Sequence, residues 1–401
     1  MKEIKAEILS WRPPRFSDFT LTRPFDDFQR ALASLGIDAV HYARIDEERG
    51  LEEAVQAAIG KASIVCVVME EGDRWQDRLD PLRKMMAKVS RKRLTLTGKS
   101  DIGLLPGGTD VFIDSQTGAP LLLLPFSLPD SSTPTLLIVS PGGEAVLKRL
   151  LKEVEKTILK LFDLRTRGRW VRMCGVQEEA IRKWRDQAAL GAEVEVKLFP
   201  APAGIDFLVR SRQETSLKSV IETIEERWGV FCYSWEGDTL EEVVGRLLLQ
   251  QKKWLAIAES CTGGRISARI TRIPGSSRYF DAACVTYSYP SKERLVGVPK
   301  EILEAKGAVS AEVAAAMADG IRRREGVDLG LSVTGIAGPD GGTAEKPVGL
   351  VYIAVSDRQE TIPERFLFQG DREEIQAQAA QMALEKVRRN LLRNERLKTQ
   401  E

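Results

Sequence analysis

A serine followed closely by two glycines stands where a short apolar segment gives way to a helical pattern. Residues 258–264 read Ala-Glu-Ser-Cys-Thr-Gly-Gly, and apolar residues at helical spacing follow over residues 265–273. A strand-to-helix turn of this kind exposes the hydroxyl of Ser260 and leaves backbone N–H groups without helical partners. It suits a nucleophile beside an oxyanion or phosphate site. Taken alone, however, such a turn is more often an ordinary helix cap with glycine for tight packing.

Further hydroxyls, a lysine and many glycines lie beside other predicted strands and turns. These positions are a Pro-Gly-Ser-Ser turn that contains Ser277, a Val-Thr-Tyr-Ser segment that contains Tyr287 and is followed by Lys292, a glycine-rich loop after Thr334, and Arg372 at the start of the last helix. Polar groups at several strand ends favour a ligand pocket in an α/β domain.

The proton acceptor for such a serine has to be something other than histidine. The chain has one histidine, His41, which lies far from these motifs in the sequence. A lysine, a carboxylate or an activated water must therefore take the proton. A lysine acts as a base only where burial or a nearby cation lowers its pKa, and most lysines are simply solvated surface charges.

Together these segments resemble the C-terminal domain of the competence/damage-inducible protein A (CinA) family, and the related stand-alone nicotinamide mononucleotide deamidases. The resemblance covers roughly residues 239–393 and rests on AESCTGG, PGSS, VTYS with Lys292, GAVS, SVTGIAGPDGG, EKPVG and GDR. Several motifs in one order make a specific signal. The resemblance implies a Ser/Lys amidohydrolase that converts nicotinamide mononucleotide to nicotinate mononucleotide and ammonia in pyridine nucleotide salvage.

This resemblance gives roles to single residues. Ser260 is the expected nucleophile and Lys292 its base, with Arg372 as a cation that could lower the pKa of the lysine. Ser277 is a rival nucleophile that we expect to position the substrate. Backbone N–H groups near residues 261–263 would hold the oxyanion. The implied catalytic residues are Ser260, Lys292, Tyr287 and Ser277.

A second set of residues is expected to hold the nucleotide. The implied substrate-binding residues are Thr262, Gly263, Gly264, Thr334, Gly335, Gly338 and Arg372. Glycines let backbone N–H groups approach a phosphate closely, and a guanidinium can grip it at two points. The alternative is a glycine-rich turn that only lets strands pack. No metal and no cofactor is expected, because this region lacks histidine and its acids are not clustered.

One position departs from the family pattern. Relatives usually have Asn-Glu after Tyr-Ser, whereas this chain has Tyr289-Pro290. Proline has no N–H group and favours extended backbone in the residue before it. We therefore expect Tyr289 to be extended and Lys292 to be shifted relative to Tyr287, at a cost in rate or specificity.

The length of 401 residues predicts two or three domains. Alternating strand and helix patterns predict an α/β domain over residues 1–162, which resembles the molybdopterin-binding-like domain of the same family. Residues 163–238 are predicted to form a small α+β, KH-like connecting domain. The α/β deamidase domain is predicted over residues 239–398.

The first domain lacks the turns that its relatives use to bind pyrophosphate. The family's Gly-Thr-Glu turn is replaced by Trp-Arg-Pro-Pro at residues 11–14, and its glycine-rich loop by Glu-Glu-Gly-Asp-Arg at residues 70–74. Prolines remove backbone donors, and glutamates repel a pyrophosphate. We expect this domain to be degenerate. Residual ADP-ribose pyrophosphatase activity and a non-catalytic, competence-linked scaffold remain as alternative functions.

The cysteine content and the net charge indicate which compartment and which partners to expect. The five cysteines form no C-x-x-C pair, which favours a reducing, cytoplasmic compartment. Cys261 could be a nucleophile, although a buried, inert thiol is the expected state. A net charge of +1 and the absence of a long apolar run or signal peptide favour neither nucleic acid nor membrane as a partner. A homodimer is the expected assembly.

Overall fold

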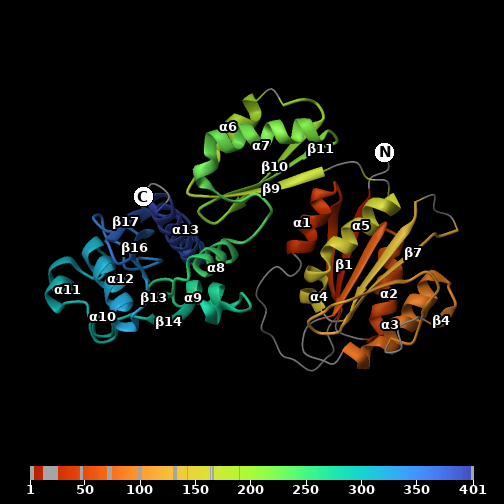
Figure 1. The fold of residues 1–401 in the computed structure, drawn as a ribbon, viewed down its shortest axis with the longest axis horizontal. Helices are drawn as coiled ribbons and strands as arrows, with labels where there is room; N and C mark the ends of the chain where they lie inside the picture. The colour runs from red at the N-terminus through yellow and green to blue at the C-terminus, as the bar shows by residue number, and fades with distance from the viewer. Residues whose placement is uncertain are drawn as a thin grey trace. The chain divides into compact units, whose positions relative to one another are not determined.

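The computed structural model describes residues 4–11, 26–45, 48–69, 75–96, 102–129, 133–141, 143–162, 164, 167–188 and 190–398. The chain, drawn in Figure 1, divides into two compact units. One contains residues 1–169, 190–195 and 208–220, and the other contains residues 170–189, 196–207 and 221–401. The predicted connecting domain is shared between the two, so the three predicted domain boundaries stay a prediction.

The N-terminal part is an α/β layer structure around a six-stranded sheet with the order β2-β1-β3-β8-β7-β6. The first four of these strands run parallel, and the last two are antiparallel to their neighbours. Its elements are β1 (Lys5–Trp11), α1 (Asp26–Ser34), β2 (Asp38–Ile45), α2 (Glu48–Ile59), β3 (Ile64–Met69), α3 (Trp75–Ser90), β4 (Leu94–Leu96), β5 (Leu104–Pro106), β6 (Asp110–Ile113), β7 (Pro120–Phe126), β8 (Thr135–Ser140), α4 (Gly143–Arg149) and α5 (Leu151–Phe162).

Both faces of this sheet are covered, since every residue of β3 and β8 is buried. One face packs against α1, α4 and α5, and the other against α2 and α3. The α/β class predicted for this region is confirmed. The helical segment over residues 143–162 is interrupted at Leu150 and forms two helices. The turns at residues 12–14 and 70–74 lie outside the described residues.

The middle segment is a small α+β structure with a four-stranded sheet of order β10-β11-β9-β12. Its elements are β9 (Arg167–Cys174), α6 (Glu178–Gln187), β10 (Val194–Ala201), β11 (Gly204–Ser211), α7 (Glu214–Trp228), η1 (Gly229–Phe231) and β12 (Cys232–Ser234). The α+β class predicted for this segment is confirmed. The order strand–helix–strand–strand–helix–strand is that of split β-α-β proteins.

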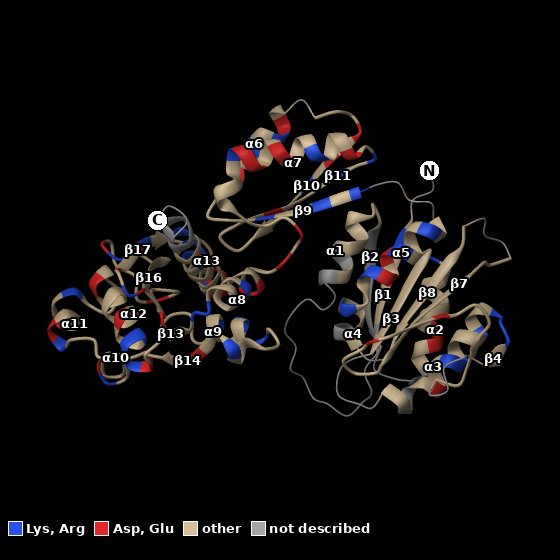
Figure 2. Cartoon of the chain, in the orientation of Figure 1, with Lys and Arg blue, Asp and Glu red and all other residues tan. Residues whose placement is uncertain are grey.

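Charges of both signs are mixed on this middle segment. Figure 2 shows acidic and basic residues interspersed along α6 and α7. Trp184 of α6 and Trp228 of α7 are buried and meet edge to face, so these two aromatic residues form core contacts. Within the described part of the chain, no helix has both the length and the apolar composition that spanning a bilayer requires.

The C-terminal part is built on a five-stranded sheet with the order β14-β13-β15-β16-β17. The first three strands are parallel, and the last two are antiparallel to their neighbours. Its elements are α8 (Leu240–Gln251), β13 (Leu255–Glu259), α9 (Arg265–Thr271), η2 (Ser276–Arg278), β14 (Phe280–Val285), α10 (Tyr289–Val296), α11 (Lys300–Lys306), α12 (Ala311–Glu325), β15 (Leu329–Gly335), β16 (Leu350–Ser356), β17 (Thr361–Leu367) and α13 (Arg372–Lys398).

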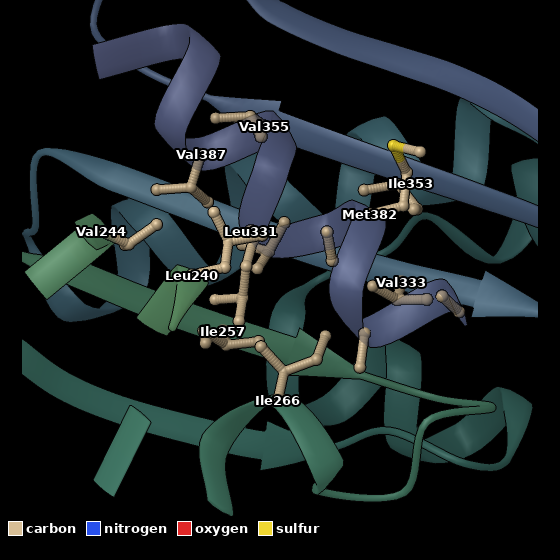
Figure 3. Packing of buried hydrophobic residues seen from close by; sticks show 14 of the residues in the cluster. Leu240, Val244, Ile257, Ile266, Leu331, Val333, Ile353, Val355, Met382 and Val387 are labelled. Atoms are coloured by element: carbon tan, nitrogen blue, oxygen red, sulfur yellow. The ribbon is translucent and has the colours of Figure 1, made fainter. Parts of the chain in front are cut away.

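Helices cover both faces of this sheet too. Figure 3 shows side chains of β13, β15 and β16 packed against α8, α9 and α13, with Ile257, Leu331 and Ile353 in the layer between sheet and helices. The opposite face of β13 packs against α10, α11 and α12. This packing fixes the carboxyl ends of β13, β14 and β15 at one edge of the sheet, where ligand sites of α/β proteins lie.

Candidate active site

Ser260 lies directly after β13, at this carboxyl edge of the sheet. Its N–H donates to the carbonyl oxygen of Val333 on β15 at 3.0 Å. On the other side, the N–H of Thr286 donates to the carbonyl oxygen of Glu259 at 2.7 Å. The serine is therefore held between two neighbouring parallel strands rather than on a mobile loop.

Lys292 reaches this serine from α10 and is completely buried. Its Nζ lies 3.0 Å from Ser260 Oγ and donates to the carbonyl oxygen of Thr286 at 2.6 Å. The structure therefore brings together the two residues that the sequence pairs as nucleophile and base. One further carbonyl, that of Tyr287, lies 3.4 Å from the same amine.

Burial lowers the pKa of Lys292 toward the range in which a lysine can accept a proton. Removal from water lowers the pKa of Lys292 from 10.5 to about 8, because desolvation disfavours the charged ammonium. We expected Arg372 to supply part of this shift, but burial is its cause. Burial also raises the pKa of Cys261 to about 12, so this thiol is protonated near neutral pH and is a poor nucleophile.

Backbone N–H groups that could hold an oxyanion follow the serine. Among the described residues, the N–H groups of Cys261 and Thr262 donate to no backbone carbonyl oxygen. Gly263, which we expected to join them, donates its N–H to the carbonyl oxygen of Ser260. Gly263 and Gly264 have φ angles of 61° and 97°, which only glycine adopts freely. Their role is to let the chain turn sharply between Ser260 and the start of α9.

A buried carboxylate that the sequence reasoning missed supports this turn. Glu259 is completely buried, and its carboxylate accepts the N–H groups of Gly264, Ile266 and Ser267 at 2.9, 3.2 and 2.9 Å. It also accepts the hydroxyl of Ser267. Glu259 thereby satisfies the unpaired amides at the start of α9. An acid between a strand and a helix start is the signal that could have identified it.

Arg372, Tyr287 and the glycine-rich loop meet on the exposed side of the site. Arg372 Nη1 donates to the carbonyl oxygen of Gly338 at 2.7 Å, and its Nη2 donates to the hydroxyl of Tyr287 at 3.1 Å. Tyr287 is 63% exposed. Two of the five N–H groups of the guanidinium are thus used within the chain, which leaves others for a ligand.

The other predicted loop residues have contacts of their own. Thr334 is buried, and its hydroxyl donates to the carbonyl oxygen of Ala308 at 2.8 Å. A Cβ on Gly335 would lie 2.6 Å from Val351, and one on Gly338 would lie 2.7 Å from Val348. These glycines are therefore required by packing within the chain, which supports the alternative that their part of the loop is structural.

Ser277 is not brought to the catalytic pair. It lies exposed in η2, just before β14, and the first residue of β14 is paired with Leu255 at the start of β13. Ser277 therefore lies at the amino ends of the parallel strands, whereas Ser260 lies at their carboxyl ends. A role for Ser277 as nucleophile with Lys292 of the same chain is therefore excluded by the direction of the parallel strands.

The extended backbone expected for Tyr289 is wrong. Tyr289 begins α10, and Pro290 lies in the first turn, where a helix does not use the missing N–H. Ser288 and Ser291 form a reciprocal cap at this end. The Tyr289 hydroxyl accepts the N–H of Ala308 at 3.1 Å. The helix, and with it Lys292, is accordingly well anchored.

Comparison with known proteins connects this site with one family. The CinA C-terminal domain family matches residues 237–391. A CinA-like protein of Dictyoglomus thermophilum is 32% identical over 97% of this chain and 100% of its own length. A CinA-like protein of Geotalea uraniireducens is 49% identical over 42% of this chain, and the match spans 40% of that relative.

Solved structures of similar sequence match the C-terminal part. The competence/damage inducible protein CihA of Agrobacterium tumefaciens is 37% identical, over 37% of this chain and 94% of that one, with a TM-score of 0.36. The assignment of this chain to a family rests on the near full-length match to the Dictyoglomus protein. By this similarity, the chain belongs to the competence/damage-inducible protein A (CinA) family.

Proposed function

We propose that this protein is an amidohydrolase that converts nicotinamide mononucleotide to nicotinate mononucleotide and ammonia. The observation that carries the proposal is the 3.0 Å contact between Ser260 Oγ and the buried amine of Lys292. Two backbone N–H groups beside the serine that donate to no backbone carbonyl oxygen, and an arginine at the rim of the site, add to it. The choice of substrate rests on the resemblance of the sequence motifs to nicotinamide mononucleotide deamidases.

The geometry supports a two-step acyl transfer. Neutral Lys292 accepts the proton of Ser260 while Oγ bonds to the carboxamide carbon, and the N–H groups of Cys261 and Thr262 stabilise the oxyanion. Protonated Lys292 then gives its proton to the departing nitrogen, so that the C–N bond breaks and ammonia leaves. Water, deprotonated by Lys292, cleaves the resulting ester, releases the carboxylate and restores Ser260.

The direct test is ammonia release by the full chain from nicotinamide mononucleotide, with the nicotinate product followed by chromatography. Stoichiometric formation of both products is expected. A folded chain that releases neither product would overturn the proposal and favour the scaffold alternative. Nicotinamide alone, which lacks ribose and phosphate, serves as the control substrate and is expected to react poorly.

The pH dependence reports the state of the lysine. A pKa of about 8 leaves about a tenth of Lys292 neutral at pH 7. Because only the neutral amine accepts a proton, kcat/KM is expected to rise about tenfold per pH unit below 8 and to level off above it. The profile is measured at constant buffer concentration and ionic strength. A kcat/KM that stays constant between pH 6 and 9 would show that another group is the base.

Arg372→Lys is expected to raise KM for nicotinamide mononucleotide by about 10- to 100-fold, because lysine cannot replace a forked, charge-assisted contact. Its kcat should change much less. Arg358→Lys is the matched control, since Arg358 is 80% exposed and paired with Asp328. Nicotinamide riboside, which lacks the phosphate, should be insensitive to the Arg372 change. An unchanged KM in the folded variant would place the phosphate elsewhere.

Dialysis against a strong chelator is expected to leave the rate of ammonia release unchanged. The proposed steps use a serine, a lysine and backbone amides, and among the described residues no group of three or more His, Cys, Asp or Glu side chains is placed to hold a metal ion. Activity that disappears on chelation and returns with one divalent ion would contradict the Ser/Lys mechanism.

A further inference from the structure

The first turns of α13 present two side chains to the active site from one face of the helix. Arg372 and Gln376 are four residues apart, so they lie one above the other. Arg372 reaches the glycine-rich loop and Tyr287, as described above. Gln376 reaches the turn that follows the nucleophile, where its Nε2 donates to the carbonyl oxygen of Cys261 at 2.8 Å. The steps of the proposed reaction give this second contact no role.

The carbonyl groups of this turn are held in two ways. The carbonyl oxygens of Ser260 and Thr262 accept backbone N–H groups of the turn itself, from Gly263 and Arg265, both at 3.1 Å. The carbonyl oxygen of Cys261, between them, accepts from a side chain of another helix, 115 residues further along the chain. The conformation of the turn therefore depends on α13 at the peptide group between Cys261 and Thr262.

This peptide group also carries the N–H of Thr262. A peptide bond is planar and trans, so its C=O and N–H groups point in opposite directions and rotate together. When Gln376 fixes the carbonyl oxygen of Cys261, it therefore fixes the direction of the Thr262 N–H as well. A hydrogen bond to the carbonyl oxygen also polarises the amide, which makes its N–H a stronger donor. The proposed reaction uses this N–H group to stabilise the oxyanion.

Gln376 is itself held in place. Ile375 and Ala379 of the same helix are buried in one hydrophobic cluster with Cys261. The side chain of Gln376 is half-buried, and its Oε1 accepts a weak hydrogen bond from Arg265 Nη2 at 3.5 Å. Because a carbonyl can only accept and a guanidinium can only donate, these two partners fix which end of the amide faces Cys261.

We propose that Gln376 is a positioning residue of the active site, which aligns the N–H of Thr262 with the oxyanion that forms at the carboxamide carbon. It acts through the peptide group of Cys261 and touches no reacting atom. Because Arg372 belongs to the same end of α13, this helix sets the arginine proposed to bind phosphate and the oxyanion donor together. The role rests on the proposed function through its use of Ser260 as the nucleophile.

Replacing Gln376 by glutamate or methionine removes the donor with little change in size. Both variants are expected to lower kcat for nicotinamide mononucleotide about 10- to 30-fold, which is less than the loss of a whole oxyanion donor. The change in KM should be roughly threefold or less, because the oxyanion forms only after the substrate has bound. The kcat/KM profile of Gln376→Met should keep its apparent pKa of about 8, because Lys292 stays buried. A loss confined to KM would contradict the positioning role.

Gln251→Glu is the matched control. Gln251 is also half-buried, and its Nε2 donates to a backbone carbonyl oxygen of α13, that of Leu391, at 3.1 Å. This bond lies about four helical turns further along α13 than Gln376. Both Gln→Glu changes should lower the thermal midpoint by a similar amount, whereas only the change at Gln376 should lower kcat. Unchanged kcat in folded Gln376→Met, or an equal fall of kcat in Gln251→Glu, would overturn the positioning role.

Reaction with a fluorophosphonate tests the same role without the nucleotide. Ser260 Oγ bonds to phosphorus, fluoride leaves and Lys292 takes the proton, while the oxyanion donors stabilise the phosphoryl oxygen. Intact-mass measurements should show one label on the unchanged protein and about tenfold slower labelling of Gln376→Met. Gln251→Glu should be labelled at the unchanged rate.

The labelling result separates the two proposals. Slower labelling of Gln376→Met in a protein that releases no ammonia would contradict the deamidation and support the role of Gln376. Equal labelling rates in an active protein would overturn that role and leave the deamidation standing. A folded chain that is neither active nor labelled would overturn both.

Discussion

Replacing Ser260 by alanine is expected to lower ammonia release from nicotinamide mononucleotide by on the order of 10³- to 10⁵-fold, and Lys292→Met should do the same. The serine supplies the attacking oxygen, and the lysine accepts its proton across 3.0 Å. Because the two act as one unit, the double variant should be no worse than either single one. Steady-state rates and product chromatography on the full chain measure this effect.

The controls separate loss of chemistry from loss of fold. Methionine nearly matches the volume of the buried lysine stem, so Lys292→Met should keep the circular dichroism spectrum and a cooperative thermal transition. Lys300→Met, at an exposed lysine of α11, should be fully active. If Ser260→Ala retained near-normal turnover, the hydroxyl would not be the nucleophile, and the assignment of the pair would be wrong.

The change Glu259→Gln is expected to lower kcat by roughly 100-fold while KM changes little. Its carboxylate accepts three backbone N–H groups and one hydroxyl around the turn that follows Ser260. An amide turns one acceptor into a donor, which faces other donors and leaves a buried N–H unpaired at a cost of about 1–3 kcal/mol. A displacement of about 1 Å at the nucleophile is enough for such a loss of rate.

A positioning role for Glu259 has a signature that a purely structural role lacks. The apparent pKa of about 8 in the kcat/KM profile should stay, because Lys292 remains buried, while kcat falls at every pH. The thermal midpoint should also fall. Glu301→Gln, an exposed acid of α11, is the matched control for the loss of charge. Unchanged kcat together with a lower thermal midpoint would show that Glu259 acts only as a helix cap and does not position Ser260.

Local patterns predicted the elements of the C-terminal part well. The apolar segment before Ser260 forms β13, and the helical pattern after Gly264 forms α9. These predictions succeed because strands and helices depend on the periodicity of neighbouring residues. The Tyr289-Pro290 prediction failed because the steric rule for a residue before proline was applied without the helix start, where proline is tolerated.

Sequence by itself determined the candidate chemistry: a serine at a strand-to-helix turn, no histidine within reach, and motifs that single out Lys292. Only the tertiary structure decided that this lysine is buried against Ser260 with a pKa near 8, because burial depends on the packing of distant segments around it. It likewise placed Arg372 beside Tyr287. It also placed Ser277 at the end of the sheet opposite to the end where Ser260 lies. Strand direction and sheet order set these distances, and neither can be read from spacing along the chain.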